Sequence, residues 1–437
     1  QLLKQQKIKK VYGIGTQIER NKQYFNDINT YSTAESLVES GDLTNLQDSI
    51  ILLKGARKFA FEKIVNALET KTHCTQLEIN LETLHHNLNY YRNLVGKETK
   101  IMGMVKAQAY GAGAVEIAKI LQSQGIEYLT VAYTDEGIQL RNNGIYTPIM
   151  VMNPQVEEFD KMASYALEPE IYNFSLLKAI DEYSNNHNKN IKIHLKLDTG
   201  MKRLGFEMNE IDKLNDELNQ MPQLWVVSIL SHLAASENPK HKEFTLHQIK
   251  QFENASQAIS DRLGYKPLWH IANSAAIQNY PESRFDMVRL GISMYGISGN
   301  SVEKKSLENV LTLKTYVSQV KNVAKGETVG YGRIGQFQED GKIATLAIGY
   351  ADGYNRSLGS GAGLFEIRGQ LCPTVGSICM DMCMVDVSHL PKINEGDEAI
   401  VFGGKIQIGT LAKAAQTIPY EMMTGISSRV KRIYIRD

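Results

Sequence analysis

From residue 75 onward, short apolar runs alternate with segments whose apolar residues recur at helical spacing. Residues 76–80 alternate apolar and polar side chains as a strand does, and residues 81–94 follow with the period of a helix. Further strand-like runs lie at residues 101–105, 128–132, 148–152, 193–197 and 224–230, and helical patterns cover residues 114–121, 135–142 and 242–263. This alternation predicts a parallel sheet, and over roughly 220 residues a closed (β/α)8 barrel is its natural form.

The pattern changes near residue 300. Short strand-like runs with Gly or Asn turns between them lie at residues 311–320, 342–348, 364–368, 384–387, 398–402 and 430–435. We therefore expect an α/β chain in which a barrel domain, residues 75–300, is followed by a mostly β domain, residues 301–437.

Residues 1–74 have a pattern of their own. A buried strand is predicted at residues 49–53, then a Gly turn with Lys54 and Arg57, then a helix over residues 61–68. This small α/β extension resembles the last segment of a Mur ligase, the ligase that joins D-alanyl-D-alanine to the muramoyl tripeptide. Since it contains no ATP-binding loop, we expect an appendage without catalysis. The chain starts with Gln1 rather than Met, which predicts that it is part of a longer fusion protein.

Composition excludes several classes of protein. The 437 residues are 43% hydrophobic and 22% charged with zero formal net charge, so nothing favours nucleic acid or an anionic membrane as partner. No apolar run approaches the roughly 20 residues that span a bilayer, and no signal peptide is visible. The four cysteines are unevenly spaced, which predicts neither disulfides nor a metal site. We expect a cytoplasmic protein.

Candidate chemistry begins at Lys106, between the strand at residues 101–105 and a turn of small residues. The carboxyl end of a strand is where α/β folds place their chemistry. A partly desolvated lysine there can lose its proton and form a Schiff base with a carbonyl cofactor. This segment alone leaves open an ordinary solvated lysine.

More candidates follow later strands. Lys196 and Arg203 flank a loop, and a guanidinium there suits a carboxylate. His232 also follows a strand, where a lone histidine is more often structural. Residues 273–276 and 287–296 bring small residues, a hydroxyl and Arg289 to positions where barrels often bind a phosphate group.

Together these motifs resemble the alanine racemase family, from about residue 75 to residue 437. The motifs lie at residues 105–113, 135–137, 196–205, 273–276 and 287–296, and in the β domain at residues 329–332, 348–353 and 379–381. The resemblance implies pyridoxal 5'-phosphate as cofactor, no metal, and interconversion of L-alanine and D-alanine, which supplies D-alanine for peptidoglycan.

The resemblance also implies roles for single residues. Lys106 would hold the cofactor covalently, Arg289 would face its pyridine nitrogen with support from His232, and Arg203 would meet the substrate carboxylate. In some members the lysine that matches Lys196 is carbamylated and supports that arginine. The cofactor phosphate would be bound by Tyr110, Ser274, Gly291 and Ile292.

The family implies a homodimer with shared sites. Tyr331 and Met380 would come from the second subunit, with Asp381 fixing the position of Tyr331. Removing an α-proton from one face and returning it to the other needs two bases. Lys106 would serve the D-alanine face and Tyr331 the L-alanine face.

Some residues depart from the family pattern. Gln108 and Ala112 stand where Asn and His are frequent, and Ser428 stands where many members carry a tyrosine that reaches the phosphate. The smaller Ser428 predicts a wider pocket and some activity on serine. The alternatives are a decarboxylase of basic amino acids, a broad-spectrum racemase, a non-catalytic pyridoxal-phosphate-binding protein and a structural partner of the ligase.

Overall fold

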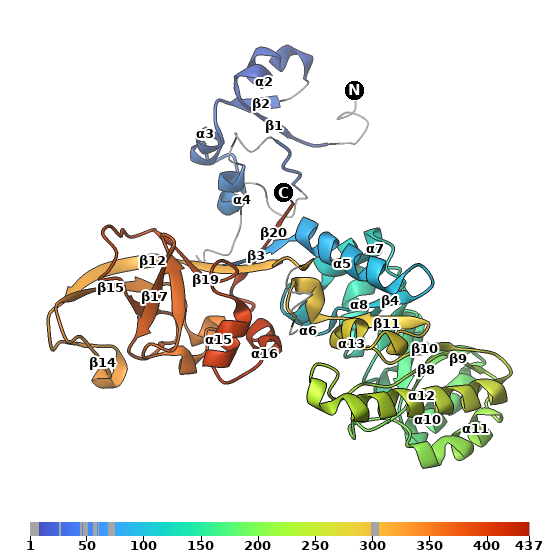
Figure 1. Ribbon diagram of the computed structural model, residues 1–437. Coiled ribbons are helices and arrows are strands. Elements are labelled where there is room, and N and C mark those ends of the chain that lie inside the picture. Colours follow the sequence, from blue (N-terminus) through green and yellow to red (C-terminus); the bar gives the residue numbers. More distant parts are fainter. Residues whose placement is uncertain are drawn as a thin grey trace. The chain divides into compact units, whose positions relative to one another are not determined.

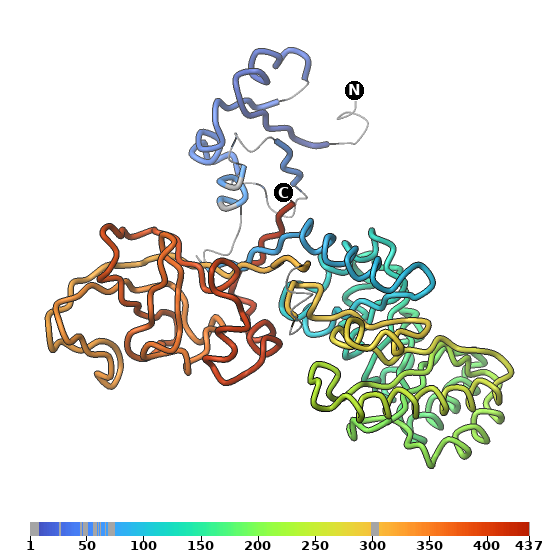
Figure 2. Tube along the Cα trace, viewed as in Figure 1, coloured from blue at the N-terminus to red at the C-terminus, as the bar shows by residue number. Residues whose placement is uncertain are grey.

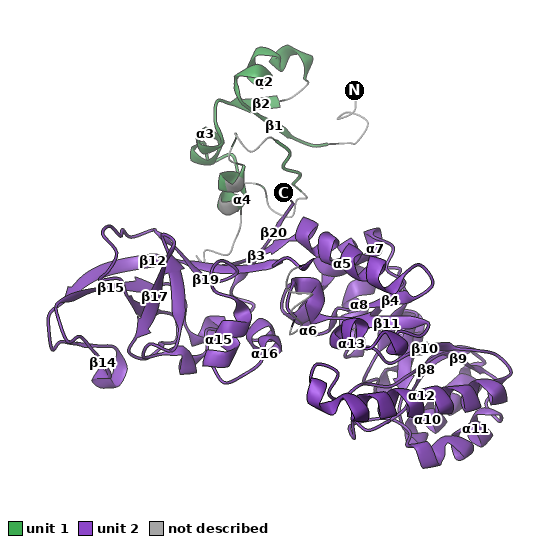
Figure 3. Ribbon diagram, in the orientation of Figure 1, with its two compact units in different colours: residues 1–73 green, residues 74–437 purple. Residues whose placement is uncertain are grey.

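The computed structural model describes residues 8–25, 28–43, 46, 51–55, 59, 61–68, 75–298 and 306–436. The chain divides into two compact units, residues 1–73 and residues 74–437 (Figure 3). Among the described residues, no helix combines the length and the apolar composition that crossing a membrane requires.

The first unit is a small α/β structure. Its strands β1 (Val11–Ile14) and β2 (Ile28–Tyr31) are parallel, α2 (Thr16–Arg20) connects them, and α3 (Ala34–Glu39) and α4 (Glu62–Leu68) follow. The helix expected at residues 61–68 is therefore present. Five residues from these elements and the loop after α3 form its core: Ile14, Ala34, Leu37, Leu43 and Ile64.

The prediction of a buried strand at residues 49–53 is wrong for those of its residues that the structure describes. Residues 51–55 belong to no strand, and the side chains of Ile51 and Leu52 are 40% and 84% exposed. Residues 49 and 50 lie outside the described residues. An apolar run becomes a strand only where a neighbouring strand satisfies its backbone, and the described residues of this unit place only β1 and β2 together.

The second unit contains the predicted barrel. Eight parallel strands follow one another around it, with β11 beside β4 and with β10 and β11 in contact where the ring closes. They are β4 (Lys100–Met104), β5 (Tyr128–Val131), β6 (Ile149–Val151), β7 (Leu167–Ile171), β8 (Ile191–Lys196), β9 (Leu224–Leu230), β10 (Leu268–His270) and β11 (Met287–Leu290).

Helices surround these strands (Figure 1). Helix α12 shows why the sequence forms them, because Ile249, Phe252 and Ile259 recur at helical spacing and are all buried. The helices are α5 (Leu81–Val95), α6 (Lys106–Tyr110), α7 (Ala114–Ser123), α8 (Thr134–Asn142), α9 (Phe159–Ser164), α10 (Phe174–His187), α11 (Ile211–Leu218), α12 (Lys242–Leu263) and α13 (Ser274–Asn279).

The C-terminal part is mostly β, as the sequence predicts. Its sheet has the order β15-β18-β17-β16-β19-β12-β3-β20, and β12 also pairs with β15. The elements are β12 (Leu311–Val323), β13 (Thr328–Val329), β14 (Gly335–Gln336), β15 (Gly341–Leu346), β16 (Leu364–Ile367), β17 (Gln370–Val375), β18 (Cys383–Asp386), β19 (Glu398–Phe402), α15 (Ile408–Ala414), α16 (Pro419–Thr424) and β20 (Lys431–Ile435).

The strand predicted at residues 76–80 is β3 (Gln76–Asn80), and it belongs to this sheet rather than to the barrel. It pairs antiparallel with β12 and parallel with β20, so that segments from the start and the end of this unit lie side by side (Figure 2). The alternation of residues 76–80 predicts a half-buried strand, but it does not say which strands it pairs with.

Candidate active site

Lys106 begins α6 directly after β4 and Val105, at the carboxyl end of the strand. Its Nζ lies 3.9 Å from Sδ of Met152, which follows β6. Burial, and then the positive charge of Arg203, lower the pKa of Lys106, against the opposing carboxylates of Glu170 and Glu136. A lowered pKa makes the neutral amine, the form that attacks a carbonyl, more accessible.

The turn after Lys106 has an unusual backbone. Ala107, Gln108, Ala109 and Tyr110 have φ angles of 50°, 54°, 51° and 57°, in the left-handed region. This conformation costs L-residues roughly 1–2 kcal/mol each, so neighbouring groups must stabilise it.

Two groups of contacts stabilise this turn. The Glu136 carboxylate accepts hydrogen bonds from the backbone N–H groups of Ala107 and Ala132, both at 2.7 Å. On the other side, Arg432 Nε donates to the carbonyl of Gly111 at 3.0 Å, and the hydroxyl of Tyr434 donates to the carbonyl of Ala112 at 2.9 Å. Strand β20 of the C-terminal sheet thus holds the loop that carries Lys106.

Tyr110, Ser274 and Gly291 form a small polar cradle beside this turn. Gly291 follows β11, and a Cβ atom at this position would lie 2.5 Å from the Tyr110 hydroxyl. The Gly291 N–H donates to Ser274 Oγ at 3.0 Å, and Ile292 follows at the start of a short helical turn. Burial raises the pKa of Tyr110, which keeps its hydroxyl as a neutral donor. Only glycine therefore allows the Tyr110 hydroxyl to lie this close to the backbone at residue 291.

Arg289, on β11, lies inside the barrel. The five hydrogen bonds that described residues make with it all involve Nη1 and Nη2, which leaves Nε–H to donate elsewhere. The acceptors include Nδ1 of His270 at 2.9 Å and the carbonyl of Ser231 at 2.6 Å. Burial lowers the pKa of Arg289 to about 10, so the guanidinium stays charged at neutral pH.

His232 lies next to Arg289, with its Nδ1 atom 3.3 Å from Nη2. Burial, followed by the charge of Arg289, lowers the pKa of His232 well below its usual value. The ring is therefore neutral, and its Nδ1 atom can accept from the guanidinium.

Lys196 forms a buried ion pair that the sequence does not indicate. Its Nζ lies 3.3 Å from Glu170 Oε1, and the other carboxylate oxygen of Glu170 has no hydrogen-bond partner among the described residues. Burial lowers the pKa of Lys196, and the Glu170 carboxylate opposes that shift. Arg203, exposed in the loop after β8, is close enough to lower the pKa values of Lys106, Lys196 and His232.

The structure does not bring Tyr331 and Met380 together with Lys106 within one chain. Their side chains are 72% and 54% exposed. Strand β14, which follows Tyr331 closely, lies at the end of the C-terminal domain away from α6 (Figure 1). Asp381 forms an ion pair with Arg429 at 2.8 Å, and Ser428 lies next to that arginine in the loop before β20.

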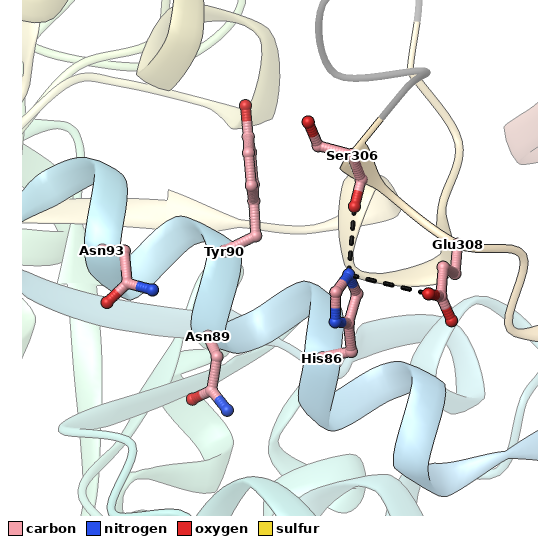
Figure 4. A pocket seen from close by; sticks show the side chains of 6 residues that line it. All are labelled: His86, Asn89, Tyr90, Asn93, Ser306 and Glu308. Carbon is pink, nitrogen blue, oxygen red and sulfur yellow. Dashed lines mark hydrogen bonds and ion pairs between the residues drawn. The ribbon is translucent and has the colours of Figure 1, made fainter.

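A surface hollow of about 470 Å³ lies over α5 and contains none of these residues. In it, His86 Nε2 lies 3.1 Å from the carbonyl oxygen of Ser306 and 3.9 Å from a carboxylate oxygen of Glu308 (Figure 4). Within the described parts of the chain, no group of three or more His, Cys, Asp or Glu side chains is arranged to hold a metal ion.

Sequence reasoning missed the carboxylates that support the site. Glu168 and Glu170 are buried in β7, whose sequence Leu-Glu-Pro-Glu-Ile does not resemble a buried strand. Glu136 lies in the motif at residues 135–137, but the sequence predicts no role for it. The available signal for β7 is its place, since the long interval between the runs at residues 148–152 and 193–197 has room for a further strand.

Comparison with known proteins covers most of the chain. Residues 79–299 match the family model "Alanine racemase, N-terminal domain", and residues 310–434 match "Alanine racemase, C-terminal domain".

Similar proteins agree with these matches. The alanine racemase of Clostridium tetani is 39% identical over 370 residues, which cover 82% of this chain and 95% of that protein. The solved alanine racemase of Clostridium difficile 630 is 35% identical with a TM-score of 0.78, over 84% of this chain and 97% of that one. The alanine racemase of Bartonella henselae, solved with covalently bound pyridoxal phosphate, is 28% identical with a TM-score of 0.78, over 83% of this chain and 99% of that one.

Proposed function

The chain belongs to the alanine racemase family, and on this premise we propose that it interconverts L-alanine and D-alanine with pyridoxal 5'-phosphate as its cofactor. The observation that carries the proposal is Lys106, a buried amine of lowered pKa at the carboxyl end of a barrel strand. Arg289 lies on strand β11 of the same barrel, and Gly291 follows that strand.

The residues fit this cofactor. An amine that readily loses its proton suits its aldehyde, and Tyr110, Ser274 and the Ile292 amide would supply donors for a phosphate group beside Gly291. When bound, pyridoxal phosphate delocalises the electron pair that remains after the α-proton departs. Arg289, with Nε–H free of described partners, would donate to the pyridine nitrogen.

Two side chains move the proton. Lys106 Nζ takes or returns the α-proton on the D-alanine face, and Tyr331 Oη of the partner subunit does so on the L-alanine face. The exposure of Tyr331 and Met380 in a single chain supports a shared site in a homodimer. Arg203 binds the substrate carboxylate, Met380 contacts the substrate region, and Asp381 helps to position Tyr331.

Arg289 restrains other reactions of the cofactor. A guanidinium with a pKa of about 10 donates a hydrogen bond but does not hand its proton to the pyridine nitrogen at neutral pH. Beside this arginine the bound cofactor would be a weaker electron sink, which would favour return of the proton to the substrate. His232 supports this arginine with its neutral ring.

Lys196 supports the cationic side of the site. The ion pair with Glu170 favours its ammonium form, whereas a carbamate would place a second negative charge beside that carboxylate. Carbamylation of Lys196 stays a prediction, and the intact mass of the protein tests it by the addition of one CO₂.

The product suits bacterial peptidoglycan synthesis, which consumes D-alanine. The resemblance of residues 1–74 to a Mur ligase supports that use and a fusion of the two activities, although the family matches begin only at residue 79. The fusion therefore stays a prediction. A decarboxylase of basic amino acids is disfavoured by the Cys379-Met380-Asp381 motif.

The proposal is tested with L-alanine, pyridoxal phosphate and the protein in heavy water, by following α-proton exchange and the chirality of alanine. The wild-type protein is expected to racemise alanine. Lys106→Ala and Tyr331→Phe are each expected to lose racemisation by at least about a hundredfold, the scale of a lost general base.

Wild-type protein that binds the cofactor but neither exchanges nor racemises alanine would contradict the assignment. Racemisation that survives in Tyr331→Phe would contradict the second base. The Ser428 hypothesis fails in the same assay if serine is used several hundredfold less efficiently than alanine, a ratio on the scale of ordinary pocket discrimination.

A further inference from the structure

A continuous line of buried polar side chains crosses the barrel interior. It takes one residue from each of five successive strands, β7 to β11: Glu168, His194, Ser228, His270 and Arg289. An apolar cluster that includes Met102, Met150 and Met287 is also buried among these strands.

The hydrogen bonds along this line are all of ordinary length. His270 Nδ1 lies 2.9 Å from Arg289 Nη1, and His270 Nε2 lies 2.9 Å from Ser228 Oγ. Ser228 Oγ lies 2.7 Å from His194 Nδ1, and His194 Nε2 lies 3.0 Å from Glu168 Oε2. The line therefore connects the guanidinium to a carboxylate through His270, Ser228 and His194.

The chemistry of the groups fixes the direction of every proton. Arg289 can only donate, so Nδ1 of His270 accepts and its Nε2–H donates to Ser228. The described residues give Ser228 Oγ only the two histidines as partners, so its own proton goes to Nδ1 of His194. Nε2–H of His194 then donates to Glu168. In this direction of donation each histidine uses the proton on Nε2, and Nδ1 accepts.

The two ends of the line carry the charges that this direction requires. Burial raises the pKa of Glu168, but the hydrogen bond and the electrostatic interaction with His194, then Lys192 and the hydrogen bond from Tyr128, outweigh burial and lower the pKa overall. Burial and then Arg289 lower the pKa of His270 well below its usual value, which keeps the ring neutral. An anion and a cation thus terminate a uniformly oriented chain of hydrogen bonds.

Such a line is costly in a barrel core. Buried carboxylate, imidazole and hydroxyl groups give up their hydration, and apolar residues of similar volume often stabilise a core more. Hydrogen-bonded neighbours polarise one another, so a fully satisfied chain is strengthened along its length. Its one connection to the candidate site is Arg289.

We propose that Glu168 is a positioning residue for Arg289, acting through Ser228 and the two histidines to fix the plane and the direction of the guanidinium. This inference rests on the proposed function for its catalytic consequence, because Arg289 is the group assigned to the pyridine nitrogen. The hydrogen-bond chain itself does not depend on the cofactor.

Nitrogen NMR of protein labelled with ¹⁵N-histidine tests the chain without cofactor. The signals of His194 and His270 are assigned by their loss in His194→Gln and His270→Gln. Both rings are expected to be neutral with the proton on Nε2. A protonated ring, or a proton on Nδ1 of either histidine, would overturn the proposal.

A matched pair of variants tests the link at Ser228. Ser228→Ala is expected to shift the ring signals of both histidines. Ser256→Ala removes the hydroxyl of another buried serine, on α12, whose Oγ has no partner among the described residues, and should shift neither. Unchanged histidine signals in Ser228→Ala would overturn the chain.

Kinetics of the holoenzyme test the positioning role. Ser228→Ala and Glu168→Gln are each expected to lower kcat for alanine at least about tenfold, with KM little changed because Arg203 binds the substrate carboxylate. Ser228→Thr, which keeps a hydroxyl, should recover most of kcat. The double variant should be no slower than the slower single variant, because both changes interrupt one chain.

The possible failures are distinguishable. Additive losses in the double variant, or a wild-type kcat in Ser228→Ala, would overturn the positioning role. Wild-type protein that shows the expected histidine signals but no racemisation would overturn the proposed function and leave the chain supported.

Discussion

Charges around Lys106 set the pH at which its amine becomes a nucleophile. Burial and Arg203 disfavour the ammonium form, while Glu170 and Glu136 favour it. The lowered pKa of Lys106 means that burial and the cations prevail. The same amine can therefore attack a carbonyl at a lower pH than a solvated lysine would.

Replacing Arg203 with a neutral residue should raise the pKa of Lys106. In Arg203→Gln a positive neighbour is lost, so the pKa of Lys106 rises and less neutral amine is present at any given pH. The pH midpoint for uptake of pyridoxal phosphate by the apoprotein, followed by absorption, should shift upward. Lys202→Gln is the matched control, since Lys202 is exposed and is not among the cations that lower the pKa of Lys106. A midpoint that stays in place in Arg203→Gln would contradict this electrostatic account.

Single functional residues can be predicted where a sequence motif marks them. They cannot be predicted where only the packing of the folded chain brings them together. The sequence identifies Lys106, Arg203, Ser274 and Arg289 because each lies in a recognisable motif. Glu170 and Ser228 have no such pattern, and their partners become neighbours only when strands pair. The register of strand pairing decides which charged residues are buried together. The sequence of a single strand does not specify that register.

At the scale of elements, the left-handed turn of α6 depends on groups outside it. Glu136, in α8, satisfies backbone N–H groups of Ala107 and of Ala132 after β5, so one carboxylate connects the segments after two neighbouring strands. Because these backbone groups need an acceptor in place of water, the carboxylate stabilises a conformation that the residues themselves disfavour.

Removing this carboxylate should loosen the turn. Glu136→Ala is expected to lower the free energy of unfolding by about 2 kcal/mol, since the N–H groups of Ala107, Ala132 and Tyr133 lose an acceptor, and to weaken cofactor binding. Glu136→Gln, with one acceptor oxygen, should fall between this variant and the wild type. Urea unfolding and cofactor titration measure both effects, with the exposed Glu157→Ala as control. Equal stability of Glu136→Ala and Glu157→Ala would show that the turn does not need this support.

Elements with regular periodicity were predicted well. Residues 242–263 coincide with α12, and residues 224–230 coincide with β9, because long or uniformly apolar patterns leave little choice. Strands β7 and β10 escaped prediction, one for its two glutamates and its proline, the other for its length of three residues. In both cases pairing with neighbours overrides a weak local preference.

At the scale of the whole molecule, a site shared between two subunits makes a specific prediction. Lys106→Ala and Tyr331→Phe should each be inactive alone. Mixed under conditions that exchange subunits, they should form heterodimers in which one site carries both intact side chains, and a fraction of wild-type activity should return. Recovery measured after mixing, against each variant mixed with itself, tests this. No recovery, with subunit exchange shown by mass, would place both bases in one chain or remove Tyr331 from the reaction.

The sequence predicts the barrel followed by a β domain, but not how the two connect. The alternation of residues 76–80 is clear, yet their partners are β12 and β20, from much later in the chain. Such non-local pairing has no signature in a single segment, since it depends on which strand edges remain open when the rest has folded.

The pairing of β3 with β20 also bears on how the protein is made. A ribosome releases the segment of Lys106 early and that of Arg432 and Tyr434 late, and the non-local contacts between them are slow to form. A nascent chain therefore contains the reactive amine before the strand that holds its loop. Truncated or stalled products would carry the lysine without the geometry, so the activity begins only when synthesis has passed β20.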